Sequence, residues 1–226
     1  MSYESTLTRV EHYFDRTATR TWERLTSDAP VSRVRATVRA GRDRMRAHML
    51  SCLADDLRGA RILDAGCGAG QMTAELAARG AEVVAVDISP SLVEIARKRL
   101  QEKHVAQVHF HSGDMLSPAL GSFDHVMAMD SLIYYSAQDI ANALGTLGAR
   151  TKRSIVFTVA PRTPLLMTMW RIGKLFPHSD RSPIMVPHST RDLGAALKDE
   201  RNTGQLRAKN RITSGFYISQ AMEFTP

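Results

Sequence analysis

The segment from Arg61 to Gly70 most constrains the fold, because a short apolar run leads directly into a glycine-rich turn. The run ends at Asp64, and Gly66, Gly68 and Gly70 follow at alternate positions. Glycines let the backbone turn tightly and approach a ligand that a Cβ atom would obstruct. A helical pattern begins at once, so the first free N–H groups of that helix point into the same space. The segment therefore predicts a strand, a turn and a helix around a nucleoside-sized pocket.

Two further carboxylates follow the next two apolar runs. Asp87 ends the second run, 23 positions after Asp64 (87 − 64), where a carboxylate can accept hydrogen bonds from both hydroxyls of a ribose. Asp114 follows the third run. A dinucleotide site needs the pattern G-x-G-x-x-G, but Gln71 or Thr73 stands at the third glycine here. The pattern therefore argues against a bound pyrophosphate.

A ligand with a positive centre and no phosphate suits this acidic turn better. S-adenosylmethionine has both properties, since its sulfonium and ammonium groups favour a nearby anion. The ordered set of glycines and acids resembles that of the class I S-adenosylmethionine-dependent methyltransferases. The resemblance implies S-adenosylmethionine as cofactor and S-adenosylhomocysteine as its product, held by Asp64, Gly66, Cys67, Gly68, Gly70, Asp87, Ile88, Asp114, Met115 and Asp130. A dehydrogenase or a vestigial nucleotide-binding domain is the alternative interpretation.

The composition is that of an ordinary globular protein with one substantial core: 226 residues, 43% hydrophobic and 23% charged. No apolar stretch reaches the ~20 residues that a membrane-spanning helix needs, and the polar N-terminus resembles no signal peptide. We therefore expect a cytoplasmic protein without a transmembrane segment. Cys52 and Cys67 show no metal-binding spacing and are expected to be packing residues, and no metal ligand is assigned.

The net charge of +7 leaves nucleic acid, anionic lipid or an acidic small molecule open as partners. Much of the excess lies within residues 33–46, where arginines alternate with Val34, Val38 and Met45. Such a basic amphipathic helix is most often a solvated face, less often a surface for membrane or protein, and sometimes an RNA-binding stripe.

The alternation of strands and helices begins only after residue 57. We therefore expect a helical N-terminal segment over residues 1–57, acting as lid or substrate segment, and a methyltransferase domain over residues 58–226. Buried-type apolar runs predict parallel strands, and the intervals predict helices. The strands are expected at Arg61–Asp64, Glu82–Val86, Val108–His111, Phe123–Met129 and Ser154–Thr158, and the helices at Gly70–Arg79, Pro90–Lys103 and Ala137–Ala149. This is an α/β doubly wound sheet with its ligand crevice at the strand carboxyl ends.

A methionine-rich apolar stretch over residues 161–188 interrupts the pattern after the fifth strand. A helix at Ser189–Glu200 and a hairpin of Gln205–Arg211 with Gly215–Phe224 follow it. The seven-stranded, Rossmann-like sheet of class I methyltransferases ends in such an antiparallel hairpin, so we interpret residues 161–188 as an insertion after strand five. The substrate side is expected to consist of the N-terminal helices and this insertion.

Five motifs outside the cofactor turn share a further resemblance. They are His12–Asp15 with Trp22, Val38–Arg42, Asp130–Tyr135, Ala160–Thr163 with Arg171–Pro177, and Thr213–Tyr217. Together they resemble the magnesium-protoporphyrin IX O-methyltransferases of bacteriochlorophyll and chlorophyll biosynthesis, nearly end to end. The resemblance implies that a propionate of magnesium-protoporphyrin IX accepts the methyl group, and it suggests contact with the magnesium chelatase, whose product is that substrate.

A porphyrin is a flat apolar disc with carboxylates on one edge, so its site needs apolar surfaces beside a few cations. The simpler alternative is that such residues merely pack the insertion on the sheet. The candidates for substrate contact are Phe14, Met167 and Trp170 as apolar surfaces, and Arg162, Arg171 and Lys174 as cations.

Tyr134 and Tyr13 are candidates for positioning roles in catalysis. An ionised propionate needs no strong base, and positioning with removal of water supplies most of the rate. Tyr134 stands where relatives often have histidine, so the role of that histidine cannot be carried over, although the tyrosine hydroxyl can orient a carboxylate. Tyr13 and Phe14 can close the site as a lid or simply pack the N-terminal helix. His178 and His188 are expected to be exposed loop histidines rather than magnesium ligands.

Other function classes stay open at this point. An RNA methyltransferase fits the basic charge, but the stretch after Met129 lacks an Asn-Pro-Pro-Tyr type of motif and the chain has few aromatics for stacking, so we expect no nucleic acid. A methyltransferase acting on another small molecule is a further alternative. A noncatalytic tetrapyrrole carrier would not need the three acids of the cofactor set. Peripheral association with the photosynthetic membrane is compatible with the basic helix.

Overall fold

The computed structural model of the protein describes residues 3–18, 32–101, 107–163, 166–167, 184–200 and 203–226. Its N-terminal part begins with α1 (Tyr3–His12) and a π-helical turn, η1 (Tyr13–Ala18). A longer helix, α3 (Arg33–Leu50), follows. The side chain of Ser32 accepts a hydrogen bond from the N–H of Arg35 and so caps α3.

The expected alternation of strands and helices is confirmed. The elements are β1 (Arg61–Ala65), α4 (Gln71–Ala78), β2 (Glu82–Asp87), α5 (Pro90–Gln101), β3 (Val108–Ser112), η2 (Pro118–Leu120), β4 (Phe123–Ala128), η3 (Leu132–Tyr134), α6 (Ala137–Gly148) and β5 (Thr151–Pro161). Strand β5 is longer at both ends than the apolar run alone indicated, because Thr151 pairs with Phe123 of β4 and because Ala160 and Pro161 pair with a short strand from later in the chain.

The strand order is β3-β2-β1-β4-β5-β8-β7, with β1 to β5 parallel. The expected helix and hairpin close the chain as α8 (Thr190–Asp199), β7 (Gln205–Ser214) and β8 (Tyr217–Thr225), and β8 runs antiparallel to β5. The seven expected strands form this path, but the sheet has eight strands. The additional strand is β6 (Pro187–His188), which the end of the insertion adds beside β5.

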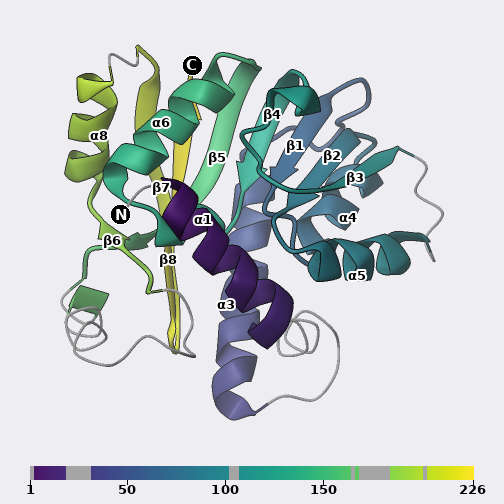
Figure 1. Ribbon diagram of the computed structural model, residues 1–226, viewed down its shortest axis with the longest axis horizontal. Coiled ribbons are helices and arrows are strands. Elements are labelled where there is room, and N and C mark those ends of the chain that lie inside the picture. Colours follow the sequence, from purple (N-terminus) through teal and green to yellow (C-terminus); the bar gives the residue numbers. More distant parts are fainter. Residues whose placement is uncertain (1–2, 19–31, 102–106, 164–165, 168–183, 201–202) are drawn as a thin grey trace.

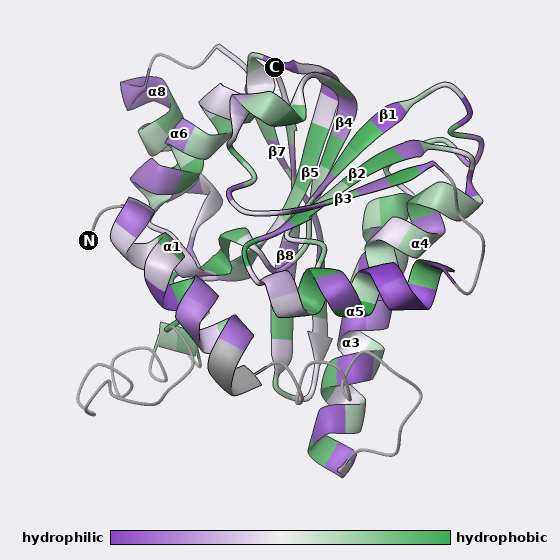
Figure 2. Ribbon diagram, turned by 45° about the vertical axis from the view of Figure 1, so that its right-hand side comes forward, coloured by the Kyte–Doolittle hydropathy of each residue, from purple (hydrophilic) through white to green (hydrophobic). Residues whose placement is uncertain are grey.

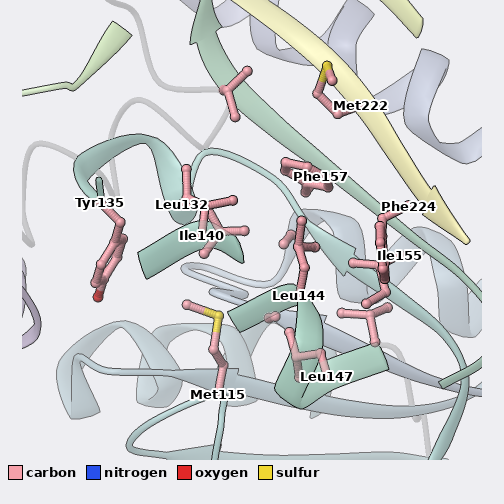
Figure 3. Packing of buried hydrophobic residues seen from close by; sticks show 14 of the residues in the cluster. Met115, Leu132, Tyr135, Ile140, Leu144, Leu147, Ile155, Phe157, Met222 and Phe224 are labelled. Carbon is pink, nitrogen blue, oxygen red and sulfur yellow. The ribbon is translucent and has the colours of Figure 1, made fainter. Parts of the chain in front are cut away.

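Helices cover both faces of the sheet (Figure 1). Side chains alternate along a strand, so neighbours such as Ile62 and Leu63 enter different cores. Leu63 belongs to the cluster that joins the sheet to α1, α6 and α8, and Ile62 to the cluster that joins it to α3 and α4. Figure 3 shows Leu144 and Leu147 of α6 against Ile155 and Phe224 in the first cluster.

Hydrophobic residues concentrate in the central strands, while the outward faces of α1 and α5 are largely polar (Figure 2). The basic helix α3 is more than a solvated face, because Met45 and Met49 are fully buried against the sheet. Its N-terminal half projects beyond the sheet and is exposed. Within the described parts of the chain, no helix is both long enough and apolar enough to cross a bilayer.

Candidate functional site

A cavity lies at the carboxyl ends of β1, β2 and β4, where the sequence predicted a ligand crevice. Leu7 and Val10 of α1 form part of its wall, and so do Arg42 and Arg46 of α3. Most of the residues expected at the site line this cavity: Phe14, Asp64, Gly66, Cys67, Gly68, Asp87, Ile88, Met115, Asp130 and Tyr134.

The three glycines of the turn all have positive φ, but they serve different purposes. A Cβ atom on Gly66 would lie 2.4 Å from the Cβ of Ser131, and one on Gly70 would lie 2.9 Å from the Cβ of Ala96. These two positions are therefore required by packing. Gly68, with φ +51°, has no atom within 4 Å of such a Cβ, so its backbone faces open space. This open position lies in the wall of the cavity, as a close approach to a ligand requires.

Two buried carboxylates hold the turn. Asp87 accepts hydrogen bonds from the N–H of Gly68 at 2.8 Å and from that of Ser89 at 2.9 Å, which fixes the turn against β2. Burial raises the pKa of Asp87. Asp64 accepts a 2.5 Å hydrogen bond from the hydroxyl of Thr73, and burial raises its pKa to about 7. A positive ligand nearby would favour the ionised form of both acids.

The cysteines behave as packing residues. Cys67 is buried in the turn, and burial together with the nearby Asp87 raises the pKa of its thiol well above the ordinary value. Cys52 is partly buried, and desolvation also raises its thiol pKa. Neither thiol has the depressed pKa of a reactive cysteine. Among the residues that the structure describes, no group of three or more histidines, cysteines or acids is placed to hold a metal ion.

Asp130 is the centre of a polar network that the sequence did not reveal. Its carboxylate accepts a 2.7 Å hydrogen bond from Arg42 and a 3.1 Å hydrogen bond from the hydroxyl of Tyr217. Its backbone is left-handed, with φ +57°, and its N–H donates to the hydroxyl of Thr158 at 2.7 Å. Burial raises the pKa of Tyr217, so that side chain stays a donor. The network brings a cation from α3 to the end of β4.

Asp114 lies beside the cavity rather than in its wall. Its Oδ1 accepts hydrogen bonds from the hydroxyl of Tyr3 and from the N–H of Leu116, and its neighbours Gly113 and Met115 line the cavity. The ring of Tyr3 also stacks on Tyr135, with the ring centres 5.0 Å apart. Sequence reasoning missed Tyr3.

Tyr134 lies in the cavity wall and is buried. The ring of Phe14 lies 6.0 Å from it, and the ring of Tyr13 lies 5.1 Å from that of Phe14. Tyr13 itself is outside the wall. Asp15, the residue after Phe14, accepts hydrogen bonds from the hydroxyl of Ser89 and from the N–H of Ser91 at the start of α5. The N-terminal segment is therefore tied to the cofactor side of the sheet.

Only some of the candidate residues from the insertion lie in the part of the chain that the structure describes. Arg162 is exposed, pairs with Asp192 at 3.1 Å and lies outside the cavity wall, as does Met167. Trp170, Arg171, Lys174 and His178 lie outside the described residues. His188 was expected to be an exposed loop histidine, and this expectation was wrong. The residue is only 5% exposed, and its Nε2 lies 2.8 Å from the carbonyl oxygen of Tyr135. It became buried because the end of the insertion pairs with β5.

The strand order, the open position at Gly68 and the buried acids beside it define a class I S-adenosylmethionine-dependent methyltransferase. A magnesium-protoporphyrin O-methyltransferase from Rhodobacter capsulatus is 58% identical over 226 residues, which cover 99% of this chain and 98% of that protein. The chain belongs to the magnesium-protoporphyrin O-methyltransferase family.

Two further comparisons agree with this assignment. The family model described as magnesium-protoporphyrin IX methyltransferase C-terminus matches residues 128–226, and a general methyltransferase domain matches residues 62–153. The crystal structure of magnesium protoporphyrin IX methyltransferase from Synechocystis PCC 6803 with bound S-adenosylhomocysteine has a TM-score of 0.80 at 28% identity, covering 96% of this chain and 98% of that one. The structure of that protein with bound S-adenosylmethionine has a TM-score of 0.78 at 25% identity. The predicted fold class is confirmed.

Proposed function

We propose that this protein transfers the methyl group of S-adenosylmethionine to a propionate carboxylate of magnesium-protoporphyrin IX. The products are the monomethyl ester and S-adenosylhomocysteine, in the pathway to bacteriochlorophyll. The observation that carries the proposal is 58% identity along the whole chain to a protein with this activity in its name. The acid-flanked cavity at the strand ends gives the assignment a physical basis.

The cavity residues fit the cofactor group by group. Val10, Ile88, Leu92 and Met115 supply apolar walls for an adenine ring. The carboxylate of Asp87 keeps lone pairs for two ribose hydroxyls while it holds the turn.

The opposite side of the cavity suits the charged amino-acid end of the cofactor. Asp64 and Asp130 supply negative charge for cationic groups, and Arg42 supplies a guanidinium for a carboxylate. When bound, S-adenosylmethionine provides a methyl group on a positively charged sulfur. The role of the chain is then to hold a second carboxylate in line with that methyl group.

The acceptor needs no activation by a base, because a propionate is ionised at neutral pH. Tyr134 lies in the cavity wall beside Phe14, and we propose that its phenolic hydroxyl orients the propionate. Exclusion of water favours a step in which opposite charges are neutralised, and in-line positioning supplies most of the remaining rate. We propose that Phe14 and Tyr13 restrict water at this point as part of the N-terminal segment 1–57.

The macrocycle is assigned to the surface between the N-terminal segment and the insertion over residues 161–188. Phe14 already lines the cavity, and both described ends of the insertion lie beside β5. The candidates Met167, Trp170, Arg162, Arg171 and Lys174 belong to that insertion and are proposed as the apolar and cationic contacts of the porphyrin.

One assay tests the reaction. The purified protein is incubated with labelled S-adenosylmethionine and, in parallel, with magnesium-protoporphyrin IX, metal-free protoporphyrin IX or bulk RNA. Label is expected in the ester of the magnesium compound, and Asp87→Ala, which removes the proposed ribose contact, serves as the inactive control. Label in RNA would support the alternative of a nucleic-acid methyltransferase, and label in neither porphyrin would contradict the proposal.

We also propose that the protein works in the cytoplasm as a peripheral protein of the photosynthetic membrane. Two large apolar side chains, Val34 and Phe216, are 52% and 66% exposed, and a hydrogen bond from Ser214 joins their segments. The exposed Arg33 and Arg35 add positive charge beside them. An apolar patch with a basic border suits an anionic lipid surface.

Flotation with vesicles tests the membrane proposal. Binding to vesicles with anionic lipid, lost in Val34→Ser/Phe216→Ser and absent with neutral lipid, is the expected result. Equal binding of the variant would contradict it. Contact with the magnesium chelatase is proposed on pathway grounds, because its product is the substrate, and co-sedimentation of the two purified proteins tests that contact.

A further inference from the structure

The two ends of the insertion meet at a defined place in the fold. The last residues of β5 pair in parallel with β6, in the register Ala160 with Pro187 and Pro161 with His188. The N–H of Arg162 then donates a 3.0 Å hydrogen bond to the carbonyl oxygen of His188. The insertion therefore begins at the carboxyl end of β5 and ends beside it, at the same end of the sheet as the cavity.

The returning end is also bonded to the turn that follows β4. The N–H of Val186 donates a 2.8 Å hydrogen bond to the carbonyl oxygen of Ile133. The Nε2 of His188 lies 2.8 Å from the carbonyl oxygen of Tyr135. Because a carbonyl only accepts, this ring nitrogen carries the proton and donates. Burial lowers the pKa of His188, which keeps the ring neutral in this form.

In the sequence, Tyr134 lies between Ile133 and Tyr135, whose carbonyl oxygens accept the two hydrogen bonds from the insertion. Tyr134 and Tyr135 both line the cavity, and both are buried. A 310 turn such as η3 has few backbone hydrogen bonds of its own, so outside partners determine how it sits. The partners on the other side are the aromatic rings of Phe14 and Tyr3. Figure 3 shows Tyr135 at the margin of the core cluster, away from Phe157 and Phe224.

We propose that His188 is a positioning residue of the methyl transfer. Through its hydrogen bond to the carbonyl of Tyr135 it fixes the turn that presents Tyr134 to the acceptor, and it thereby links the insertion to the cofactor cavity. The proposal rests on the proposed function of Tyr134 and assigns His188 no contact with substrate or magnesium. It accounts for a buried histidine at the one place where the insertion touches both β5 and η3 among the described residues.

The experiment compares His188→Leu, which removes the donor, with His188→Gln, whose amide nitrogen can reach the same carbonyl. Ser189→Ala is the matched control, because Ser189 caps α8 next to His188 without touching the turn. His188→Leu is expected to lower kcat/KM for magnesium-protoporphyrin IX by about tenfold, with the Kd of S-adenosylhomocysteine changed less than about threefold. His188→Gln should recover most of the loss. Ser189→Ala should lower the Tm and leave kcat/KM unchanged.

A merely structural role gives a different pattern. If His188→Leu lowers the Tm but keeps kcat/KM, or if His188→Gln is as impaired as His188→Leu, the proposal is overturned. If His188→Leu does not fold, His188→Asn, which is too short to reach Tyr135, is compared with His188→Gln in its place.

A second readout separates this proposal from the proposed function. In protein labelled with fluorotyrosine, the 19F resonance of Tyr134, assigned with Tyr134→Phe, should move in His188→Leu and stay in place in Ser189→Ala. This signal requires no turnover. An inactive wild-type protein would sink the proposed function, whereas an unmoved resonance would sink the role of His188.

Discussion

The hydroxyl of Tyr3 donates a 2.8 Å hydrogen bond to Oδ1 of Asp114, 111 positions further along the chain. The bond ties α1 to the loop after β3, and α1 supplies Leu7 and Val10 to the cavity wall. Burial first, and then the nearby Tyr135 and Asp114, raise the pKa of Tyr3, so the hydroxyl remains a donor at neutral pH.

Tyr3→Phe keeps the ring that stacks on Tyr135 and removes only the hydrogen bond to Asp114. A net loss of about 1 kcal/mol is expected for such a bond, which corresponds to about fivefold weaker binding of S-adenosylhomocysteine if α1 must be in place for binding. Isothermal titration calorimetry measures it. Thr8→Ala in the same helix removes only a bond within α1 and should bind normally. Equal Kd values for Tyr3→Phe and wild type would show that α1 does not control the cavity.

The ion pair of Arg42 with Asp130 should matter for both stability and binding. Arg42→Met would remove the ion pair of Asp130 and leave its carboxylate with hydrogen bonds from the hydroxyls of Tyr217 and Thr158 only. Because a buried charge without a partner of opposite sign is costly, we expect a loss of about 2 kcal/mol in the free energy of unfolding. Urea denaturation measures it. Adding Asp130→Asn should restore part of the stability, because the charge is gone. Strictly additive losses would contradict this account.

The cofactor turn and the sheet could be predicted because their signals are local. Short stretches of sequence predict the strand that ends at Asp64 and the glycine turn after it. They also predict the alternation of strands and helices. The closing hairpin is local in the same sense. The positions of Asp64, Asp87 and Asp130 followed, since the carboxyl ends of parallel strands meet at one edge of the sheet.

The partners of Asp130 and of the Tyr135 carbonyl could not be predicted, because they come from distant parts of the chain. Arg42 is 88 positions before Asp130, and His188 is 53 positions after Tyr135. In a helix with many arginines, spacing does not tell which guanidinium turns inward until the sheet that buries Met45 is known. The left-handed backbone of Asp130 could not be predicted either, since only a few per cent of residues other than glycine adopt such a conformation.

Gly66 and Gly68 should respond differently to alanine. Both have positive φ, so each substitution carries backbone strain of about 1 kcal/mol. In Gly66→Ala the new Cβ would also lie 2.4 Å from that of Ser131, so a larger loss of stability is expected. In Gly68→Ala the methyl group meets no protein atom and points into open space at the cavity, so folding survives while cofactor binding is lost.

Thermal unfolding and calorimetry with S-adenosylhomocysteine separate these two effects. The expected order is a lower Tm for Gly66→Ala than for Gly68→Ala, with binding abolished in Gly68→Ala at a temperature where it is folded. Normal binding by folded Gly68→Ala would mean that the cofactor does not approach the turn at this position.

The raised pKa of Asp64 makes binding of a positive ligand depend on pH. Burial raises this pKa from 3.8 to about 7, so the folded protein without ligand holds a proton on Asp64 that the unfolded chain has already lost. Stability of the ligand-free protein therefore declines as pH rises through this interval, since the folded state binds more protons. A cationic ligand favours the ionised carboxylate, so binding releases that proton at pH values below about 7.

The affinity for S-adenosylmethionine should therefore rise with pH from about 6 and level off near about 8, by at most about tenfold per unit. Calorimetry in buffers of different ionisation enthalpy reports the proton release directly. S-adenosylhomocysteine, which lacks the sulfonium charge, should show a weaker dependence, and Asp64→Asn, which keeps an acceptor for the hydroxyl of Thr73, should show none. The same pH slope in Asp64→Asn and wild type would assign the titration to another group.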